Sequence, residues 1–201
     1  MNLDQPSRQR HFEALYAADD DPWHVRDKWY ERRKRAILLA SLGKSRYRNA
    51  FEPGCGNGEM SAALAQRCDQ LLACDGSASA VAAARRRVAQ AGAERGRVRV
   101  ERRSLPADWP RAAAFDLVVV SELAYYFEPA ALVSLLSLAG ASVEAGGELV
   151  LCHYLHDFDD RAASTELVHA AAGRLPGFVR TLRHADEDFL LEVFRKQGGN
   201  T

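Results

Sequence analysis

The chain has 201 residues, 47% of them hydrophobic, and its 27 Lys and Arg residues balance 27 Asp and Glu residues. This length and composition are those of one globular domain with a full core. A net charge of zero gives no indication of nucleic-acid binding, for which a strongly basic surface is typical. Residues 1–10 are polar and no apolar run approaches the ~20 residues of a membrane span, so we expect a cytoplasmic protein with no membrane partner.

The cysteines show neither a C-x-x-C pair nor the spacing of metal ligands; they are Cys55, Cys68, Cys74 and Cys152. Most of them lie beside or within apolar runs, where a thiol behaves as a small hydrophobic side chain. We therefore expect reduced thiols and no metal site.

The N-terminal part of the chain predicts two helices, from Arg8 to Ala18 and from Trp23 to Leu42, separated by an acidic stretch that ends in Pro22. Strand and helix patterns alternate only after these helices. We expect residues 1–46 to form a helical cap that is part of the same domain as residues 47–201.

From Tyr47 onward, alternating strands and helices indicate a parallel sheet with crossover helices. The predicted strands run over Tyr47–Glu52, Leu71–Asp75, Val98–Val100, Phe115–Val120 and Glu148–Cys152. The predicted helices run over Glu59–Arg67, Ser77–Ala91 and Pro129–Val143, the last of them stopped by Gly146-Gly147. At the end of the chain, Phe178–Arg183 and Phe189–Arg195 flank a short acidic turn and predict an antiparallel hairpin.

The segment from Phe51 to Glu59 places three alternate glycines, Gly54, Gly56 and Gly58, between the first predicted strand and the helix that follows it. Glycine lets the backbone turn tightly and leaves no Cβ to keep a ligand away. The N-terminus of the next helix directs free N–H groups and a positive dipole end to the same place. Asp75 ends the second strand, where a carboxylate reaches ribose hydroxyls. The pattern predicts a site for an adenosine-containing cofactor.

The spacing distinguishes between cofactors. A dinucleotide site has the pattern G-x-G-x-x-G, and Glu59 occupies its third glycine position here. Carboxylates at Glu52 and Glu59 disfavour a negatively charged pyrophosphate but tolerate S-adenosylmethionine, which carries a sulfonium cation and an amino-acid end. The pattern Glu52-x-Gly54-x-Gly56-x-Gly58 resembles motif I of the class I S-adenosylmethionine-dependent methyltransferases.

Three further segments extend this resemblance over nearly the whole chain. They are Asp21-Pro22-Trp23 with Trp29 to Arg35, Asp108-Trp109-Pro110, and Ser121 to Tyr126. Together with the glycine loop they resemble the nodulation protein S (NodS) type of methyltransferase, which N-methylates the free amine of a deacetylated chitooligosaccharide. The resemblance implies an α/β, three-layer Rossmann-like fold with a mostly parallel seven-stranded sheet, a C-terminal antiparallel hairpin and an N-terminal helical cap.

The resemblance also assigns the cofactor-binding residues. Around the methionine part of S-adenosyl-L-methionine it places Glu52, Gly54, Cys55, Gly56 and Gly58, with Ser121 at the end of the central strand. Asp75 would accept the ribose hydroxyls, and Gly76 or Ser77 would lie beside the adenine. The acid that normally follows the third strand is missing, so Ser104 or the backbone of Leu105 would replace it. Tyr30 and Arg33 of the cap are candidates for holding the cofactor carboxylate.

Candidates for catalysis follow the fourth and fifth strands. An amine acceptor must lose a proton before it attacks, which favours a carboxylate or a neutral imidazole near the methyl group. Glu122 comes directly after the central strand, at the edge where ligands of such sheets gather, and is the first candidate. Tyr125 could orient a cationic amine through its ring or hydroxyl, and His153 after the fifth strand could assist as a base.

Other interpretations stay open at this point. The acceptor could be an oxygen or another small metabolite, or the protein could be a scaffold that binds the cofactor without catalysis, as the missing acid would allow. An oligosaccharide acceptor would need stacking surfaces such as Trp23, Trp29 and Trp109 could offer, and a smaller amine fits equally well.

Overall fold

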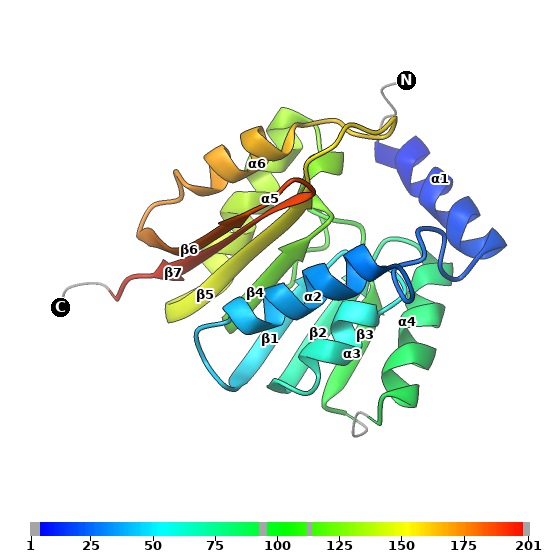
Figure 1. The fold of residues 1–201 in the computed structure, drawn as a ribbon, viewed down its shortest axis with the longest axis horizontal. Helices are drawn as coiled ribbons and strands as arrows, with labels where there is room; N and C mark the ends of the chain where they lie inside the picture. The colour runs from blue at the N-terminus through cyan, green and yellow to red at the C-terminus, as the bar shows by residue number, and fades with distance from the viewer. Residues whose placement is uncertain (1–4, 93–95, 112–113, 199–201) are drawn as a thin grey trace. The chain divides into compact units, whose positions relative to one another are not determined.

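The computed structural model describes residues 5–92, 96–111 and 114–198. These residues form two compact units, the first ending at Ser104 and the second beginning at Leu105 (Figure 1). The first unit consists of α1 (Gln5–Ala18), α2 (Trp29–Ser41), β1 (Tyr47–Pro53), α3 (Glu59–Leu64), β2 (Cys68–Asp75), α4 (Ala78–Gln90) and β3 (Val98–Arg102). The second consists of β4 (Phe115–Ser121), the 3-10 turn η1 (Ala124–Tyr126), α5 (Pro129–Ser142), β5 (Val143–Tyr154), α6 (Thr165–Ala172), β6 (Phe178–Ala185) and β7 (Phe189–Lys196).

The strands confirm the predicted sheet. Their order is β3-β2-β1-β4-β5-β7-β6, in one seven-stranded sheet. In the first unit β2 pairs in parallel with both β1 and β3. In the second unit β4 and β5 are parallel, whereas β7 is antiparallel to β5 and to β6. The mostly parallel sheet with a C-terminal antiparallel hairpin is that of the Rossmann-like class I methyltransferase fold. The predicted cap boundary at residue 46 stays a prediction, and α1 and α2 fall in the same unit as β1.

Burial and capping explain why β4 and α4 could be predicted from the sequence. Every residue from Phe115 to Val120 in β4 is buried, as expected of a strand covered on both faces. In the first unit the alanine-rich α4 begins at an N-cap, because the Ser77 hydroxyl accepts a hydrogen bond from the Ala80 N–H at 3.0 Å. Its buried face packs with Cys55, Ala73 and Val100 in one apolar cluster.

The predicted helix from Trp23 was wrong at its beginning, because α2 starts only at Trp29. The carboxylate of Asp21 accepts hydrogen bonds from the N–H groups of Val25 and Arg26, at 2.8 and 3.1 Å. His24 adopts a left-handed φ of 57°. The backbone N–H groups of this stretch are thus satisfied by a side chain, which favours a turn over a helix.

Two further differences lie in the second unit. The Gly146-Gly147 pair does not stop α5, which ends at Ser142; the glycines lie inside the segment of β5. Gly147 is needed there because a Cβ would come within 2.9 Å of Val143 Cγ1 and 3.2 Å of Asp116 Cα. The helix α6 was not predicted, although Ser164 gives a recognisable N-cap by accepting the Leu167 N–H at 3.2 Å.

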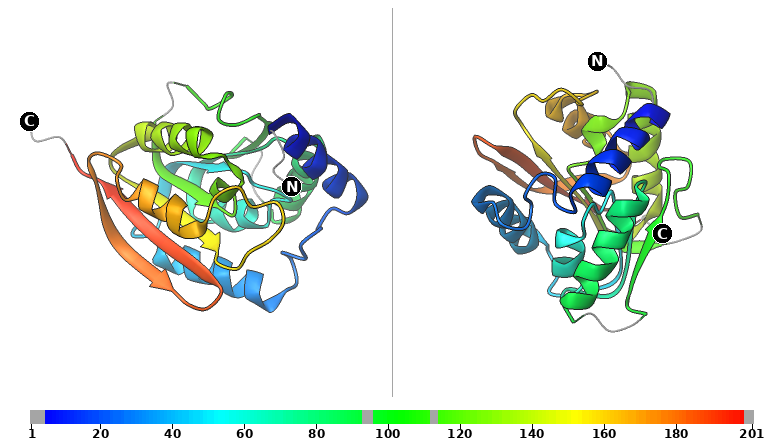
Figure 2. Two further views of the ribbon diagram at one scale, coloured as in Figure 1. Left: turned by 90° about the horizontal axis from the view of Figure 1, so that it is seen from above. Right: turned by 90° about the vertical axis from the view of Figure 1, so that its right-hand side faces the viewer.

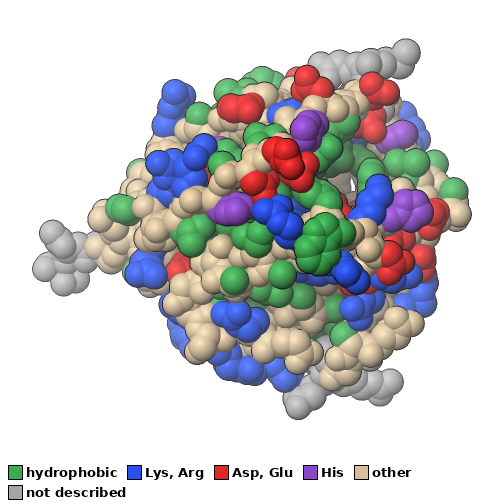
Figure 3. Space-filling model, viewed as in Figure 1, with side chains coloured by type: hydrophobic (Ala, Val, Ile, Leu, Met, Phe, Trp, Pro, Cys, Tyr) green, Lys and Arg blue, Asp and Glu red, His purple; other side chains and the backbone are tan. Residues whose placement is uncertain are grey.

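The surface carries charges of both signs. In Figure 3, acidic side chains stand among the Lys and Arg side chains of the face that is shown. Exposed ion pairs such as Arg86–Asp20 at 3.5 Å account for part of this pattern in the first unit, and such pairs contribute only about 0–1 kcal/mol each. Of the helices that the structure describes, none has the length and apolar character needed to cross a membrane.

The close packing of the glycine loop on α4 leads to a stability prediction. Gly58 has a φ of 85°, and a Cβ there would lie 2.7 Å from the Cα of Ala84. Gly58→Ala should therefore combine backbone strain with overpacking and lower the free energy of unfolding by about 2–4 kcal/mol. Denaturant unfolding of the variant measures this loss.

Gly92→Ala is the matched control, because Gly92 has a similar φ of 74° but, among the described residues other than its chain neighbours, no atom within 4 Å of its Cβ position. It should cost only the backbone strain, about 1 kcal/mol. Equal losses in the two variants would show that contact with α4 does not constrain the loop.

Candidate active site

The loop between β1 and α3 turns sharply enough to require its glycines. Gly54, Gly56 and Gly58 all have left-handed φ values, of 72°, 52° and 85°. The backbone N–H groups of Gly54 and Cys55 both donate to the Cys74 carbonyl at the end of β2, at 2.7 and 2.9 Å. The loop is thereby held against the end of the neighbouring strand, and the tight turn is the one that its glycines predicted.

Asp75 fastens this loop through its side chain. One carboxylate oxygen accepts the Gly56 N–H at 3.0 Å, and the other accepts the Ser77 N–H at 2.9 Å. Burial raises the pKa of Asp75 above its ordinary value, even though the N–H groups of Ser77, Gly56 and Gly76 donate to the charged form. A carboxylate has about four lone-pair positions, so these contacts leave acceptor capacity for ligand hydroxyls.

The two glutamates of the motif have different surroundings. Glu59 pairs with Arg87 at 2.6 Å, Arg26 at 3.3 Å and Arg35 at 4.0 Å. Burial opposes its ionisation, but the hydrogen bond and charge of Arg87 and its neighbours keep the pKa of Glu59 below the usual range. Glu59 thus serves as an anchor for three arginines.

Glu52 is 3% exposed, and its carboxyl accepts a hydrogen bond from the Ser61 hydroxyl at 2.5 Å. Burial, together with the charge of nearby Asp75, raises the pKa of Glu52 to about 8. Among the ion pairs of the described residues, none includes Glu52 or Asp75. A buried Glu52 and a half-buried Asp75, neither with a basic partner in the described part of the chain, form a pair of acceptors that fits a ligand with a positive charge and hydroxyl groups.

Helix α1 lies against the start of α4 (Figure 1 and the right-hand view of Figure 2). The Glu13 carboxylate accepts the Ala78 N–H at 2.6 Å and the Ser79 hydroxyl at 2.7 Å. The Gln9 amide donates to the Gly76 carbonyl at 3.1 Å. A Cβ on Gly56 would lie 2.5 Å from the Tyr16 hydroxyl oxygen. One face of α1 therefore covers both the glycine loop and the end of β2.

Sequence reasoning missed Gln9, Glu13 and Tyr16. Their spacing of four and then three residues places them on one face of a helix, which was a signal that could have been used. The helix itself was predicted from residue 8 to residue 18. Nothing in the sequence indicated which helix or loop this face would contact.

The turn before α2 is also tied to the loop. The Asn57 amide donates to Asp21 at 2.9 Å, and the same carboxylate accepts the backbone N–H groups described above for the turn. Both Asp21 and Asn57 are buried. The position of the N-terminal segment is therefore coupled to the conformation of the glycine loop.

Other predicted cofactor residues lie in several environments. The Cys55 thiol is buried in the apolar cluster under the loop, so only its backbone remains to meet a ligand. Burial, with the charges of Asp75 and Glu52, raises the pKa of this thiol. The Ser104 hydroxyl lies 3.5 Å from the Gln9 amide oxygen.

The remaining assignments stay predictions. In α2, the Lys34 ammonium lies 4.7 Å from the ring centroid of Tyr30. Arg33 directly precedes Lys34 in the same helix. Leu105 is buried at the start of the second unit, and Ser121 is half-buried at the end of β4. None of these contacts tests a role in cofactor binding.

In the second unit, Glu122 follows β4 in a strained conformation. Its φ of 51° is left-handed, which is unusual for a residue other than glycine. The carboxylate accepts a short hydrogen bond from the Tyr125 hydroxyl and another from the Tyr154 N–H at 3.1 Å. Strain of this kind persists only where surrounding contacts enforce it. Here the two hydrogen bonds hold the Glu122 side chain in one place.

Tyr125 and His153 are both buried, at 4% and 0% exposure. Their rings pack edge to face with centroids 5.1 Å apart, and the ring centroids of Phe158 and Tyr125 are 5.0 Å apart. The Nε2 atom of His153 accepts the Ala124 N–H at 3.1 Å, and its Nδ1 atom lies 3.2 Å from His169 Nε2. His153 is thus surrounded by protein groups on both ring nitrogens.

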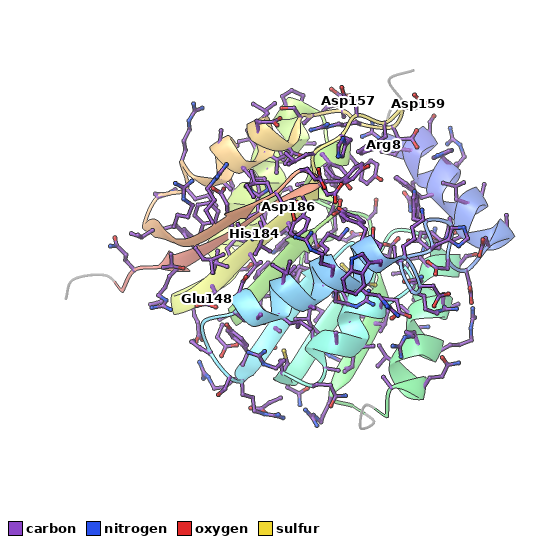
Figure 4. The ribbon with its side chains drawn as sticks, viewed as in Figure 1. Arg8, Glu148, Asp157, Asp159, His184 and Asp186 are labelled. Atoms are coloured by element: carbon purple, nitrogen blue, oxygen red, sulfur yellow. The ribbon has the colours of Figure 1, made fainter. Side chains whose placement is uncertain are left out.

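The loop after β5 includes Asp157 and Asp159 (Figure 4). Asp157 is exposed and pairs with Arg161 at 2.9 Å. Across the described part of the chain, no group of three or more His, Cys, Asp or Glu side chains could hold a metal ion.

Comparisons with known proteins agree with this geometry. A family model described as a methyltransferase domain matches residues 50–147. Nodulation protein S of Rhizobium tropici is 34% identical over 110 residues, a stretch that covers 54% of this chain and 44% of that protein. The chain thus matches less than half the length of that relative.

Two solved structures cover more of the chain. A putative methyltransferase from Pseudomonas syringae is 44% identical, with 83% of this chain and 99% of that chain covered and a TM-score of 0.71. The N-methyltransferase NodS from Bradyrhizobium japonicum, in complex with S-adenosyl-L-homocysteine, is 26% identical, with coverages of 94% and 98% and a TM-score of 0.81.

The raised pKa of Glu52 predicts how stability depends on pH. The folded protein retains this proton up to about pH 8, whereas the unfolded chain loses it near the ordinary pKa of 4.5. The folded state binds more protons between these values, so its stability falls as the pH rises from about 5 to 8. Glu52→Gln should remove this pH dependence. As the pH rises over that interval, the free energy of unfolding of the variant should increase by about 2–4 kcal/mol relative to that of wild type. Denaturant unfolding at several pH values measures the difference, and parallel stability curves would contradict it.

Proposed function

Because the chain belongs to the class I S-adenosylmethionine-dependent methyltransferases and is NodS-like, we propose that it methylates an amine of a small molecule or an amino sugar. The observation that carries this proposal is the Glu122 carboxylate, held by Tyr125 and Tyr154 in a strained conformation directly after β4. A deacetylated chitooligosaccharide is the acceptor class that the NodS likeness suggests.

The cofactor is S-adenosylmethionine, and the two carboxyl groups of Glu52 and Asp75 in the first unit fit it as hydrogen-bond acceptors. We propose that Asp75 accepts the ribose hydroxyls and that Glu52 accepts the positively charged amino group. Glu52 has no basic partner among the described residues, and burial together with the charge of Asp75 raises its pKa. When bound, the cofactor supplies a methyl group attached to a positively charged sulfur.

The acceptor side requires a proton acceptor. An amine is mostly protonated near neutral pH, and its nitrogen can form a bond to the methyl carbon only after losing that proton. Glu122 is proposed to receive the proton and to stabilise the positive charge of the methylated product. Because two donors already fix its carboxylate, the side chain needs little reorganisation to do so.

Tyr125 holds the Glu122 carboxylate in place for this role. Its ring is 4% exposed and packs against Phe158 and His153, while its hydroxyl donates to Glu122. The hydroxyl is therefore engaged with the carboxylate. We propose that Tyr125 orients Glu122 and acts on the amine through it.

The exposure of the tryptophan rings shows which of them could stack against a sugar acceptor. Trp109 is 4% exposed and offers no surface to a sugar, which removes it from the stacking residues considered above. Trp29 and Trp23 are 70% and 37% exposed. These two exposed rings are compatible with an amino-sugar acceptor and also with a smaller amine.

A matched pair of acceptors tests the proposal. A deacetylated chitooligosaccharide and its N-acetylated counterpart carry the same ring hydroxyls, but only the first has a basic amine. Formation of S-adenosylhomocysteine with the first, or with smaller primary amines, and none with the second would support amine transfer. Turnover of both oligosaccharides alike would favour an oxygen acceptor instead.

Glu122→Gln should lower kcat/KM for the amine roughly 100- to 1,000-fold, because the amide cannot accept the proton. Its affinity for S-adenosylhomocysteine should stay unchanged. Glu128→Gln, at an exposed position just before α5, is the control and should retain wild-type activity. An active Glu122→Gln enzyme would exclude Glu122 as the proton acceptor.

A further inference from the structure

A chain of hydrogen bonds runs through the second unit from η1 to the edge strand β6. The Ala124 N–H donates to His153 Nε2 at 3.1 Å, and His153 Nδ1 lies 3.2 Å from His169 Nε2. His169 Nδ1 then lies 2.9 Å from one oxygen of Glu192. The other Glu192 oxygen accepts from Arg180 at 2.6 Å. Five elements, η1, β5, α6, β7 and β6, are thereby joined through side chains.

The middle of this series of hydrogen bonds is buried. His153 is fully buried, His169 is 4% exposed and Glu192 is 2% exposed. Buried polar groups are costly unless they are hydrogen-bonded, and a buried carboxylate is more costly than a neutral imidazole. The contacts are therefore expected to be formed together and to constrain one another.

The direction of the chain is fixed at both ends. A backbone N–H can only donate, so His153 Nε2 must be an acceptor and its proton must be on Nδ1. Burial opposes ionisation of Glu192, but the hydrogen bond from His169 and the hydrogen bond and charge of Arg180 keep its pKa below the usual range. The carboxylate can only accept, so His169 also carries its proton on Nδ1. Three hydrogen bonds then use three protons, those of Ala124, His153 and His169.

The Ala124 end of the chain adjoins the proposed acceptor site. Tyr125 is the next residue, and its ring packs on His153 with centroids 5.1 Å apart. Its hydroxyl is the donor that holds Glu122. A displacement of η1 would move this hydroxyl away from the carboxylate.

We propose that His153, His169 and Glu192 are positioning residues that hold η1, and with it Tyr125 and Glu122, through a relay of fixed tautomers. This inference rests on the proposed function, since Glu122 is the group that is positioned. It assigns His153 a different role from the catalytic base that the sequence suggested, because both of its ring nitrogens are engaged inside the protein.

Glu192→Gln tests the relay without changing side-chain size. Arg180 remains a donor and will keep the amide oxygen, so the amide nitrogen must face His169 Nδ1 and donate to it. Both histidines would then carry their protons on Nε2, and His153 would direct an N–H group at the Ala124 N–H. The substitution is thus expected to reverse the chain and release η1.

Glu148→Gln is the matched control. Like Glu192, Glu148 is buried and pairs with an arginine of the β6–β7 hairpin, in this case Arg195 of β7 at 3.2 Å. Figure 4 shows it on β5, away from the end where Asp186 marks the turn of the β6–β7 hairpin. The same chemical change is therefore made at the same burial, outside the relay.

Two measurements read the relay without any acceptor. Two-bond 15N–1H spectra of histidine-labelled protein should show the Nδ1–H tautomer for His153 and His169 in wild type and in Glu148→Gln, and the Nε2–H tautomer in Glu192→Gln. Hydrogen exchange should show a protected Ala124 N–H that loses its protection only in Glu192→Gln. Nε2–H histidines or an unprotected Ala124 in wild type would overturn the relay. If wild type methylates no amine, the proposed function fails, while these spectra still decide on the relay.

Turnover tests the positioning role. In Glu192→Gln, kcat should fall roughly 10- to 100-fold, as expected of a misplaced catalytic group, with unchanged affinity for S-adenosylhomocysteine. His153→Gln should retain more activity than His153→Leu, because its amide oxygen can still accept the Ala124 N–H. A full kcat in a Glu192→Gln protein whose Ala124 N–H has lost protection would show that the relay does not position Glu122.

Discussion

The carboxylate of Asp75 connects the parts of the first unit that form the proposed cofactor site. It accepts N–H groups from the glycine loop at Gly56 and from the start of α4 at Ser77, so that a strand end, a loop and a helix meet at one side chain. The left-handed glycines let the loop approach this carboxylate, and α1 covers the same place through Glu13 and Gln9. The loop has little freedom beyond this arrangement, which is the preorganisation that a binding site requires.

Much of the fold could be predicted because its signals are local. The mostly apolar β4 and the glycine loop follow directly from the order of residues, and the structure confirms them. The errors occurred where a side chain competed with the backbone. Asp21 satisfies the N–H groups of its own turn and delays α2 to Trp29, and the glycine pair at 146–147 lies in β5 instead of ending α5. A pattern of residue types does not reveal which of these competing hydrogen bonds is formed.

In the candidate site, too, residues with a local sequence signal could be predicted and those placed by tertiary contacts could not. Glu52 and Asp75 were found because their positions relative to the glycines are fixed by the strand–loop–helix geometry. The contacts of Gln9 and Glu13 were not found, since they join residues more than sixty positions apart in the sequence. For the histidine relay, the sequence showed His153 but neither its partner His169 nor the buried Glu192. Tertiary contacts decide whether a histidine meets a ligand or another side chain, and sequence spacing carries no information about them.

Calorimetric titration with S-adenosylhomocysteine tests the central claim most directly, because it needs no acceptor. Wild type should bind the ligand with micromolar affinity, and Asp75→Asn should weaken binding at least about tenfold, the loss expected when an amide replaces a carboxylate that accepts hydrogen bonds. Asp69→Asn, on the same strand but half-exposed beside Arg46, should bind as wild type does. No binding to folded wild type, or equal binding by Asp75→Asn, would contradict a cofactor site at the glycine loop.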